Sequence, residues 1–452
     1  MTDLPNGWEH APIGSLCTLN NGRAFKPSEW QVRGIPIVRI QNLNNPSAPY
    51  NHFLGEYDAR YHLRGGELLF AWSGTPGTSF GAHVWRGGEA VLNQHIFRVD
   101  FDEGMLDKRY FQHAINQKLN ELIGVAHGGV GLRHVTKGKF EQTHVAVPPL
   151  NEQKRIADKL DAVLARVDAC RERLDRVPDI LKRFRQAVLA AAVSGDVTEE
   201  WRERGGISKA WLESDVQSVS QVGTGSTPLR SNASFYADQG TPWITSAATS
   251  RPFVLSATQF VTDAAVQAHR LKTYPIGTLL VAMYGEGKTR GQISELCIEA
   301  TINQACAAIV VDEAITLRAF LKLVLQANYL EMRELAEGGN QPNLNLSKIK
   351  EFPVLLPSLD EQHEIVRRIE SLFAYVDRLE ARYAAARAQV ERLTPALLAR
   401  AFRGELVPQD PNDEPGSVLL ECIRAARAAV PAKPRRGRSN LAAPNAPTAG
   451  PT

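Results

Sequence analysis

The sequence predicts an α+β protein made by tandem duplication. Two mixed α/β domains are each followed by a long helix, and the two helices pair as an antiparallel coiled coil. Three observations lead to this prediction: motifs that recur about 210 residues apart, short β-branched segments early in each repeat, and heptad spacing of apolar residues late in each repeat.

Motifs in the first half of the chain recur in the second half. Asn93-Gln94 recurs as Asn303-Gln304, and Pro-Pro-Leu-Asn-Glu-Gln at 148–153 recurs as Pro-Ser-Leu-Asp-Glu-Gln at 357–362. Solenoid repeats are only about 20–50 residues long, so a period of about 210 residues indicates two whole domains.

The repeat divides the chain into five segments. They are a mixed domain at 1–147, a helical region at 148–205, a second mixed domain at 206–356, a second helical region at 357–407 and a tail at 408–452. The tail is rich in Pro, Ala and Arg, a composition that buries too little apolar surface to offset the entropy of ordering. We therefore expect the tail to be disordered.

Within the mixed domains, β-branched segments alternate with clusters of Gly, Pro and Asn, which predicts short strands. The expected strands are 35–40, 67–72 and 95–100 in the first domain, and 279–283 and 307–311 in the second. Longer apolar periodicities predict helices at 108–123 and 317–336.

After each Pro-rich hinge the apolar residues step by four and three, the heptad pattern of a coiled coil. The predicted seam consists of Ile156, Leu160, Val163, Val167 and Leu174 in the first helix, and Ile365, Ile369, Leu372, Val376 and Leu379 in the second. A helix over 152–177 is ~40 Å long, too long to be covered by its own domain, so we expect it to pair with its duplicate.

Prolines and glycines mark the ends of these helices. Pro178 interrupts the first helix, whereas the second runs on to Pro395. A shorter apolar helix is expected after each one, at 180–193 and 396–402, followed by Gly195 or Gly404 as the terminating residue.

The composition is that of an ordinary globular protein. The 452 residues are 43% hydrophobic and 22% charged, and the net charge is only +3. No segment approaches the ~18 consecutive apolar residues of a membrane span, and the five cysteines form no Cys-x-x-Cys pair. These features predict a cytoplasmic protein with no membrane partner and no zinc ribbon, in which any nucleic-acid binding comes from local patches.

Residues 282–289 resemble a phosphate-binding loop that contains Lys288, and 307–313 resemble a Walker B strand. A true phosphate loop needs a helix directly after its Lys-Thr, so that backbone N–H groups face the phosphates. Here residues 290–294 predict a turn and a strand, and the first repeat has no lysine in this loop. An ATPase is therefore a minor alternative, which a nucleotide-binding titration would test.

Other catalytic motifs are weaker. Glu152-Gln153-Lys154 has the form of a nuclease metal site, but its duplicate ends in His363, and we interpret both glutamates as acids that favour a helix start. Residues 45–50 match the Asn-Pro-Pro-Tyr motif of amino-methyltransferases only in part. Nine of the eleven histidines precede Pro148, without helical pair spacing and without counterparts in the second repeat. We assign no catalytic residue and no metal ligand.

The nucleic-acid signal lies in loops. Basic residues crowd a Gly-rich loop of the first repeat, and amides occupy the duplicate loop at 338–345. Arg and Lys bind guanine and phosphates, whereas Asn and Gln read adenine. The candidate DNA contacts are Arg39, Gln41, Trp72, Ser73, Arg133 and Lys137 in the first repeat, and Tyr284, Lys288, Arg290, Asn340, Gln341 and Asn343 in the second.

The doubled Pro-x-Leu-x-Glu-Gln motif that leads into a heptad helix resembles the specificity subunit of type I restriction-modification systems. The resemblance covers residues 4–407, and it includes the early Trp8 and its counterpart Trp211. It implies that each mixed domain is a target-recognition domain that reads one half of a split double-stranded DNA sequence.

The resemblance also implies partners. The helices would form a spacer that binds modification (methyltransferase) subunits, of which we expect two, and restriction (endonuclease/translocase) subunits would join them. S-adenosylmethionine, ATP and Mg would belong to those partner subunits, and none to this non-catalytic chain. The alternative is a stand-alone coiled-coil DNA-binding or scaffolding protein, which co-purification with a methyltransferase would exclude.

Overall fold

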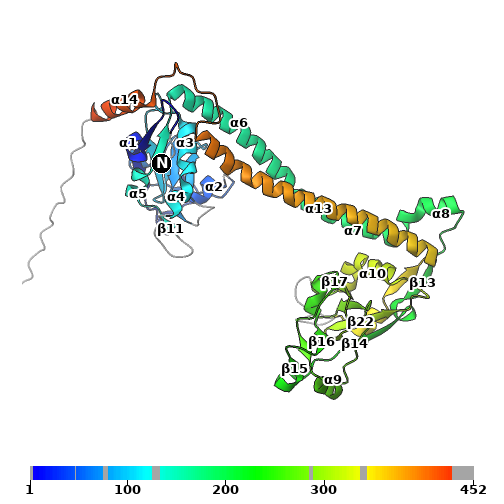
Figure 1. The fold of residues 1–452 in the computed structure, drawn as a ribbon. Coiled ribbons are helices and arrows are strands. Elements are labelled where there is room, and N and C mark those ends of the chain that lie inside the picture. The colour runs from blue at the N-terminus through cyan, green and yellow to red at the C-terminus, as the bar shows by residue number, and fades with distance from the viewer. Residues whose placement is uncertain are drawn as a thin grey trace, which may run out of the picture. The chain divides into compact units, whose positions relative to one another are not determined.

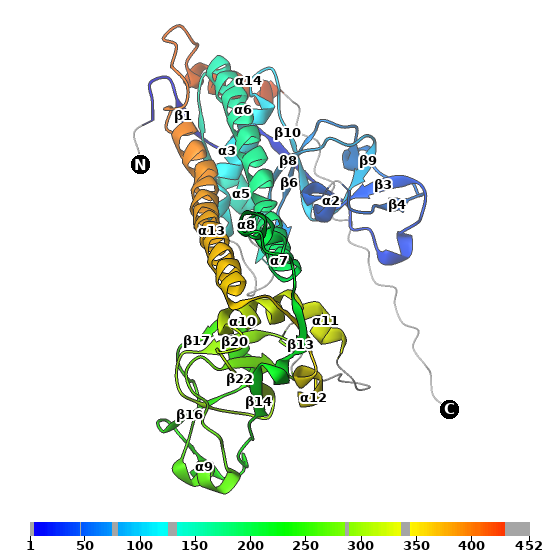
Figure 2. The ribbon, with the colours of Figure 1, turned by 90° about the vertical axis from the view of Figure 1, so that its right-hand side faces the viewer.

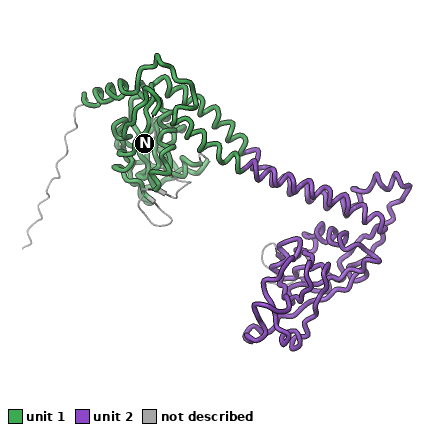
Figure 3. The backbone as a smooth tube through the Cα atoms, viewed as in Figure 1, with its two compact units in different colours: residues 1–171, 388–452 green, residues 172–387 purple. Residues whose placement is uncertain are grey.

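The computed structural model describes residues 4–45, 47–74, 80–124, 133–284, 289–335 and 344–429. Its contacts divide the chain into two compact units, residues 1–171 with 388–452 (unit 1) and residues 172–387 (unit 2) (Figure 3). Unit 1 therefore combines segments from both ends of the sequence, whereas unit 2 is one continuous segment.

The main sheet of unit 1 has four antiparallel strands in the order β2-β10-β6-β8, of which Figure 2 labels β10, β6 and β8. Their bounds are Thr18–Asn21 for β2, Ile96–Asp100 for β10, Leu68–Ala71 for β6 and Gly81–Val84 for β8. The apolar strand β6 is wholly buried. Its Phe70 shares one core with Ile156 and Leu160 of the following long helix.

Smaller sheets and helices complete unit 1. The strands are β4 (Asn51–Phe53), β3 (Ile35–Val38), β9 (Ala90–Leu92) and β5 (His62–Leu63) in one sheet, with the pairs β1 (Glu9–Pro12)/β12 (His144–Val147) and β7 (Ser73–Gly74)/β11 (Arg133–His134). The helices include α1 (Ile13–Leu16), α2 (Ile40–Asn44), α3 (Lys108–Gln117), α4 (Leu119–Gly124), α5 (Lys137–Gln142) and α14 (Gly416–Ala429).

Unit 2 repeats this plan, which confirms the duplication. Its main sheet is β14 (Ser220–Thr224), β22 (Cys306–Val311), β19 (Leu279–Ala282), β20 (Ile293–Leu296) and β17 (Phe253–Val254), in that order. The smaller sheets are β15 (Tyr236–Ala237), β18 (Phe260–Val261), β16 (Thr241–Ile244) and β21 (Thr301–Ile302), and the pair β13 (Leu212–Asp215)/β23 (Pro353–Leu356). Its short helices are α8 (Glu199–Gly205), α9 (Asp263–His269), α10 (Arg318–Ala327), α11 (Tyr329–Glu334) and α12 (Leu346–Lys350).

Three long helices, α6 (Leu150–Asp175), α7 (Val177–Ser194) and α13 (Leu359–Ala401), follow the mixed domains. In unit 2 an ion pair joins Arg185 to Asp377 at 2.6 Å, and a second joins Asp175 to Arg387 at 2.5 Å. Residue numbers fall along one partner as they rise along the other, so the pairing is antiparallel, as predicted.

The same pairing direction holds in unit 1, between α6 and the end of α13. Arg171 Nη2 donates a hydrogen bond to Thr394 Oγ1 at 2.9 Å. Nearer the start of α6, Leu160 shares the unit 1 core with Ala401.

Some helix bounds differ from the predicted ones. Residues 396–401 belong to α13, because Pro395 lies inside that helix and does not end it. The predicted helix 108–123 is two helices that meet at Lys118, and 317–336 is likewise divided at Asn328. The break before Pro178 is present, since α7 begins at Val177 with proline in its first turn.

The segment after residue 407 is more ordered than its composition predicted. Helix α14 packs against β1 and α1 and buries Leu419, Leu420 and Ile423 in the unit 1 core; Figure 1 shows it beside α1. These three apolar side chains bury enough surface to hold the helix in place, although the segment around them is rich in Ala and Arg. Residues 430–452 lie outside the described part of the chain.

Candidate nucleic-acid interface

In unit 1, several loops meet at the end of strand β6. The Trp72 N–H donates to the His95 carbonyl at 3.2 Å, and the Trp72 carbonyl accepts from the Val135 N–H at 2.9 Å. The Asn93 N–H donates to the Val38 carbonyl at 3.1 Å, which attaches the smaller sheet at the same place. Backbone hydrogen bonds thus hold four chain segments side by side at one end of the sheet.

Unit 2 makes the same three backbone bonds with equivalent residues. Met283 donates to Ala305 at 2.8 Å and accepts from Leu344 at 3.1 Å, and Asn303 donates to Ile244 at 2.9 Å. The two repeats therefore build the same loop platform, although the side chains that they display differ.

Aromatic and imidazole groups gather on the unit 1 platform. The Trp72 ring stacks on Phe97, with centroids 5.6 Å apart, and lies 5.4 Å from His95 and 5.9 Å from His134. Its Nε1 donates to Asn21 Oδ1 at 3.3 Å. This cluster offers ring faces and N–H donors, the groups that contact bases and phosphates.

Burial lowers the pKa of His95, and the positive charges of His134 and Arg39 lower it further. A neutral imidazole has one donor and one acceptor nitrogen. His95 Nε2 lies 3.1 Å from Gln94 Nε2, so the pair can present a mixed donor and acceptor edge.

The predicted contacts of the first repeat lie in different surroundings. Arg39 precedes α2, with its guanidinium 5.1 Å from the Trp30 ring centroid. Gln41 is exposed, whereas Ser73 is buried, with 5% of its surface accessible. Lys137 Nζ donates to the Leu19 carbonyl at 3.2 Å. Val38, the residue before Arg39, is bonded to Asn93 at the platform, while Ser73 faces the interior.

Most predicted contacts of the second repeat lie outside the described residues, namely Lys288, Asn340, Gln341 and Asn343. Tyr284 is exposed at the end of β19. The Arg290 carbonyl accepts a hydrogen bond from Arg333 Nη1 at 2.9 Å. For Arg133 of the first repeat only the backbone is described, paired with Gly74 in the β7/β11 ladder.

Sequence reasoning missed the platform residues His95, His134, Asn21 and Gln94. The duplicated Asn-Gln pair was the available signal: Gln304, the counterpart of Gln94, accepts a hydrogen bond from the Thr227 hydroxyl. No periodicity indicates that Asn21, in β2, meets Trp72, because sheet pairing brings them together from 51 positions apart.

The Glu-Gln pair of the duplicated motif has a structural role. The Trp8 indole donates to Glu152 Oε2 at 2.9 Å, and the Trp211 indole donates to Glu361 Oε2 at 3.1 Å. Both glutamates are buried. Each repeat therefore joins its beginning to its long helix by the same bond, and the helix-start explanation from sequence is incomplete.

The following glutamines connect the helix to the domain body. Gln153 Nε2 donates to the Pro148 carbonyl at 2.9 Å, and its Oε1 accepts from the Asp107 N–H at 3.0 Å. In unit 2, Gln362 makes the matching bonds to Pro357 at 3.0 Å and Leu317 at 2.8 Å. The motif is a joint between domain and helix, which accounts for its presence in both copies.

The two joints differ in charge. Glu361 is also held by an ion pair with Arg202 and by the Thr198 hydroxyl at 2.8 Å, all within unit 2. No such ion pair to Glu152 occurs among the described residues, and burial raises the pKa of the Glu152 carboxyl.

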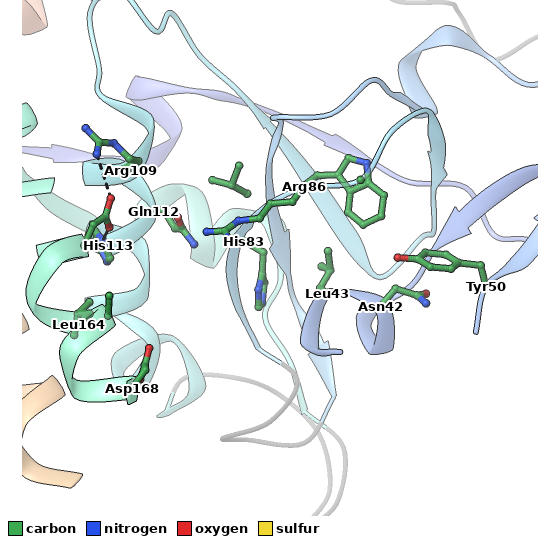
Figure 4. A pocket seen from close by; sticks show the side chains of 15 residues that line it. Asn42, Leu43, Tyr50, His83, Arg86, Arg109, Gln112, His113, Leu164 and Asp168 are labelled. Carbon is green, nitrogen blue, oxygen red and sulfur yellow. Dashed lines mark hydrogen bonds and ion pairs between the residues drawn. The ribbon is translucent and has the colours of Figure 1, made fainter. Parts of the chain in front are cut away.

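A cavity of about 920 Å³ lies between α2, β8, α3 and α6 of unit 1 (Figure 4). His113 Nε2 lies 2.9 Å from Asp161 Oδ1 along one wall, and Arg109 Nη1 donates to Asp161 Oδ2 at 3.2 Å. Arg109 and His113 therefore both contact the Asp161 carboxylate on this wall.

Neither a metal site nor a membrane span occurs within the ranges that the structure describes. No group of three or more His, Cys, Asp or Glu there could hold a metal ion. In the same ranges, no helix combines the length and the apolarity needed to cross a bilayer.

Comparison with known proteins gives consistent matches. Residues 5–178 and 208–386 match the family model of the type I restriction modification DNA specificity domain. The specificity subunit of type I restriction enzyme EcoBI from Escherichia coli is 31% identical, and the match covers 95% of this chain and 94% of that protein. The EcoKI specificity subunit of E. coli K12 is 28% identical, with 94% and 97% coverage.

Solved structures agree on the fold. The crystal structure of the HsdS subunit from Thermoanaerobacter tengcongensis has a TM-score of 0.59 at 19% identity, and the match covers 89% of this chain and 98% of that one. A chain from a study of complex assembly and conformational transition of the type I R-M system has a TM-score of 0.71 at 19% identity, with 90% and 100% coverage.

Proposed function

Because this chain belongs to the type I restriction-modification specificity subunit family, we propose that it directs a restriction-modification complex to a DNA target made of two half-sites. The observation that carries the proposal is the duplicated loop platform. Two domains with the same backbone bonds but different exposed side chains are suited to read two different short sequences.

We propose the recognition domains at 1–147 and 206–356, each reading its half-site through the end of its main sheet. In the first domain, the proposed contacts are Trp72, Arg39 and the histidine pair, which would supply stacking and positive charge, and Lys137 is a further candidate. In the second, the proposed contacts are Tyr284 and Arg290, and Lys288, Asn340, Gln341 and Asn343 are further candidates. Phosphate contacts would position the DNA, and base-edge contacts would specify it.

The long helices are the proposed binding surface for two modification subunits, with restriction subunits joining the complex. The seam residues from Ile156 to Leu174 and from Ile365 to Leu379 would hold the helix pairs together. Several of them are buried, among them Ile156, Ile369 and Val376. Partner subunits would supply S-adenosylmethionine, ATP and Mg, and this chain is a non-catalytic member of a cytoplasmic complex.

Mapping of methylated sites tests the proposal. Residues 1–147 are exchanged for the corresponding segment of a relative, and the chain is assembled with its modification subunits. The methylated sequence should change in one half only, and the reciprocal exchange of 206–356 should change the other half. A change in both halves, or in neither, would contradict independent reading by the two domains.

Co-purification tests the partner assignment. The full chain, expressed with modification subunits of the same system, should emerge from size exclusion in one complex with them. A chain that binds DNA sequence-specifically but never captures a methyltransferase would support the stand-alone alternative instead.

A further inference from the structure

Unit 2 contains a cleft whose charged lining residues are all cations. The cleft has a volume of about 650 Å³ and is lined by α7, the 3-10 helix η6 (Ser246–Ser250), the start of β20, α10 and α11, of which Figure 2 labels all but η6. Among its described lining residues are Lys182 of α7, Arg251 after η6 and Arg333 of α11, and no acidic residue. A concave surface lined by one sign of charge concentrates ions of the opposite sign.

These three cations lack acidic partners within the part of the chain that the structure describes. Lys182 and Arg251 are exposed, and Arg333 is half-buried. By contrast, two other cations of the same unit, Arg318 and Lys322 on α10, each contact the Glu295 carboxylate at 3.0 Å. The charge of the cleft is therefore left for a ligand.

Arg333 is held in place by its neighbours. Its Nη1 donates to the Arg290 carbonyl at 2.9 Å and lies 3.0 Å from the Tyr329 hydroxyl, and the guanidinium is 5.4 Å from the Tyr329 ring centroid. Gly291, at φ +81°, leaves room for this side chain, because a Cβ there would lie 3.1 Å from Arg333 Cγ. Both bonds to described residues use Nη1, so the Nε and Nη2 donors remain for a ligand, and a guanidinium suits phosphate oxygens.

The cleft adjoins the loop platform of the second domain. The carbonyl of Gln292, a lining residue, accepts from the Ala282 N–H at 3.0 Å, and the Gly291 N–H donates to the Ala282 carbonyl at 2.8 Å. The next residue, Met283, makes two of the backbone bonds that define the platform. A duplex bound at the platform would therefore have its backbone close to the cleft.

The first repeat does not share these charges. Counted from the terminating glycines of the two repeats, Lys182 corresponds to Glu391, and counted from the starts of α10 and α3, Arg333 corresponds to Ile123. Since the first repeat adopts the same plan with a glutamate and an isoleucine at these places, the fold does not require the cations.

We propose that Lys182, Arg251 and Arg333 bind phosphates of double-stranded DNA beside the half-site read by the second domain. This inference rests on the proposed DNA-recognition function. Continuity with the platform favours DNA over an acidic segment of a partner protein as the ligand. The three contacts add affinity without sequence information, because phosphates are the same at every base.

The test measures the salt dependence of DNA binding by the full chain in complex with its modification subunits. In the triple variant, Lys182, Arg251 and Arg333 are all changed to Gln. If each cation neutralises one phosphate, the slope of log K against log[salt] should fall in magnitude by about 2.7. Between 50 and 200 mM salt, the wild-type affinity should then fall ~40-fold more than that of the variant.

A double variant guards against a folding defect, because Arg333 packs on Tyr329 whereas Lys182 and Arg251 are exposed. Lys182→Gln with Arg251→Gln should leave thermal unfolding unchanged and still reduce the slope by about 1.8.

Two controls separate the cleft from positive charge in general. Arg251→Lys with Arg333→Lys keeps the cations and should keep the slope. Arg204→Gln removes an exposed cation of α8, outside the cleft, and should also leave the slope unchanged.

Uncharged methylphosphonates in the DNA locate the contacts, because each one removes a single phosphate charge. Exchange of 206–356 identifies which half-site belongs to the second domain. Methylphosphonates beside that half-site should weaken binding by the wild type but not by the triple variant. Those beside the other half-site should weaken both equally.

An unchanged slope in the triple variant would overturn the inference, and so would equal sensitivity of wild type and variant to every methylphosphonate. A triple variant that no longer assembles with the modification subunits would show that the cleft binds protein. Loss of the preference for target over non-target duplex would show that the cations read bases. Failure of the proposed function itself appears differently, as a wild-type complex that does not distinguish any target from other DNA.

Discussion

The buried joint of unit 2 makes a quantitative prediction about stability. Arg202 and Glu361 form an ion pair in which 8% and 4% of their side chains are accessible. Arg202→Met keeps an unbranched apolar side chain but leaves the Glu361 carboxylate without a cation. Breaking one side of a buried pair costs about 3–5 kcal/mol. Because Thr198 and the Trp211 indole still donate to Glu361, we expect the free energy of unfolding to fall by about 3 kcal/mol, the low end of this range.

Hydrogen exchange of the full chain is the suitable assay, because it assigns the loss to a segment. A loss of about 3 kcal/mol corresponds to exchange roughly 150-fold faster in peptides that cover 195–215 and the start of α13. Urea unfolding should show the same loss as a lower midpoint for unit 2.

The matched control is Arg204→Met, two residues away. Its ion pair with Glu200, at 2.6 Å, has 75% and 72% of the side chains accessible, so its loss should cost less than about 1 kcal/mol. The double variant Arg202→Met with Glu361→Gln should recover part of the stability, because the buried charge is then removed. If Arg202→Met and Arg204→Met lower the free energy of unfolding equally, burial does not explain the contribution of the Arg202–Glu361 pair.

Three further outcomes are expected. Glu152→Gln should stabilise the protein, and the gain over wild type should grow as pH rises from about 4 to neutral. The raised pKa of Glu152 makes the folded wild type bind more protons than the unfolded chain, so wild-type stability falls through that range. Urea midpoints in a pH series should show the difference between variant and wild type disappearing at acid pH. Leu420→Ala should lower the stability of unit 1 by about 2 kcal/mol, whereas exposed Val418→Ala should change it little in the same unfolding assay. Trp72→Ala should weaken DNA binding by ~1–3 kcal/mol when the first half-site is present, and equal loss on DNA lacking that half-site would exclude a specific role.

The sequence predicted those features that produce a periodic or duplicated residue pattern. Heptad steps from Ile365 onward indicated a long helix and its pairing, since the packing of such a helix repeats every two turns. The doubled Glu-Gln motif indicated where each domain meets its long helix, but not which residues the glutamate and glutamine bond. Its partners Trp8 and Asp107 lie 144 and 46 positions away from the residues that they bind, and only the folded chain brings them together.

The recognition platform was harder to predict for the same reason. Trp72 and Arg39 were chosen as contacts from residue type, and they do lie around one sheet end. Ser73, its neighbour, was chosen on the same grounds but is buried, at the start of β7 where the chain pairs with β11. Helix α14 was missed since three apolar residues, Leu419, Leu420 and Ile423, do not raise the hydrophobicity of a tail dominated by Ala, Pro and Arg.

The composition of unit 1 from both ends of the chain has a consequence for biosynthesis. During translation, unit 2 is complete once residue 387 has emerged, whereas the first domain must wait for α14. At about 5–20 residues per second, the interval between residues 171 and 423 is roughly 13 to 50 s. For that time the apolar surface that later receives Leu420 stays uncovered on the nascent chain. A ribosome that stops early would therefore release a chain whose second domain is folded and whose first domain is still open.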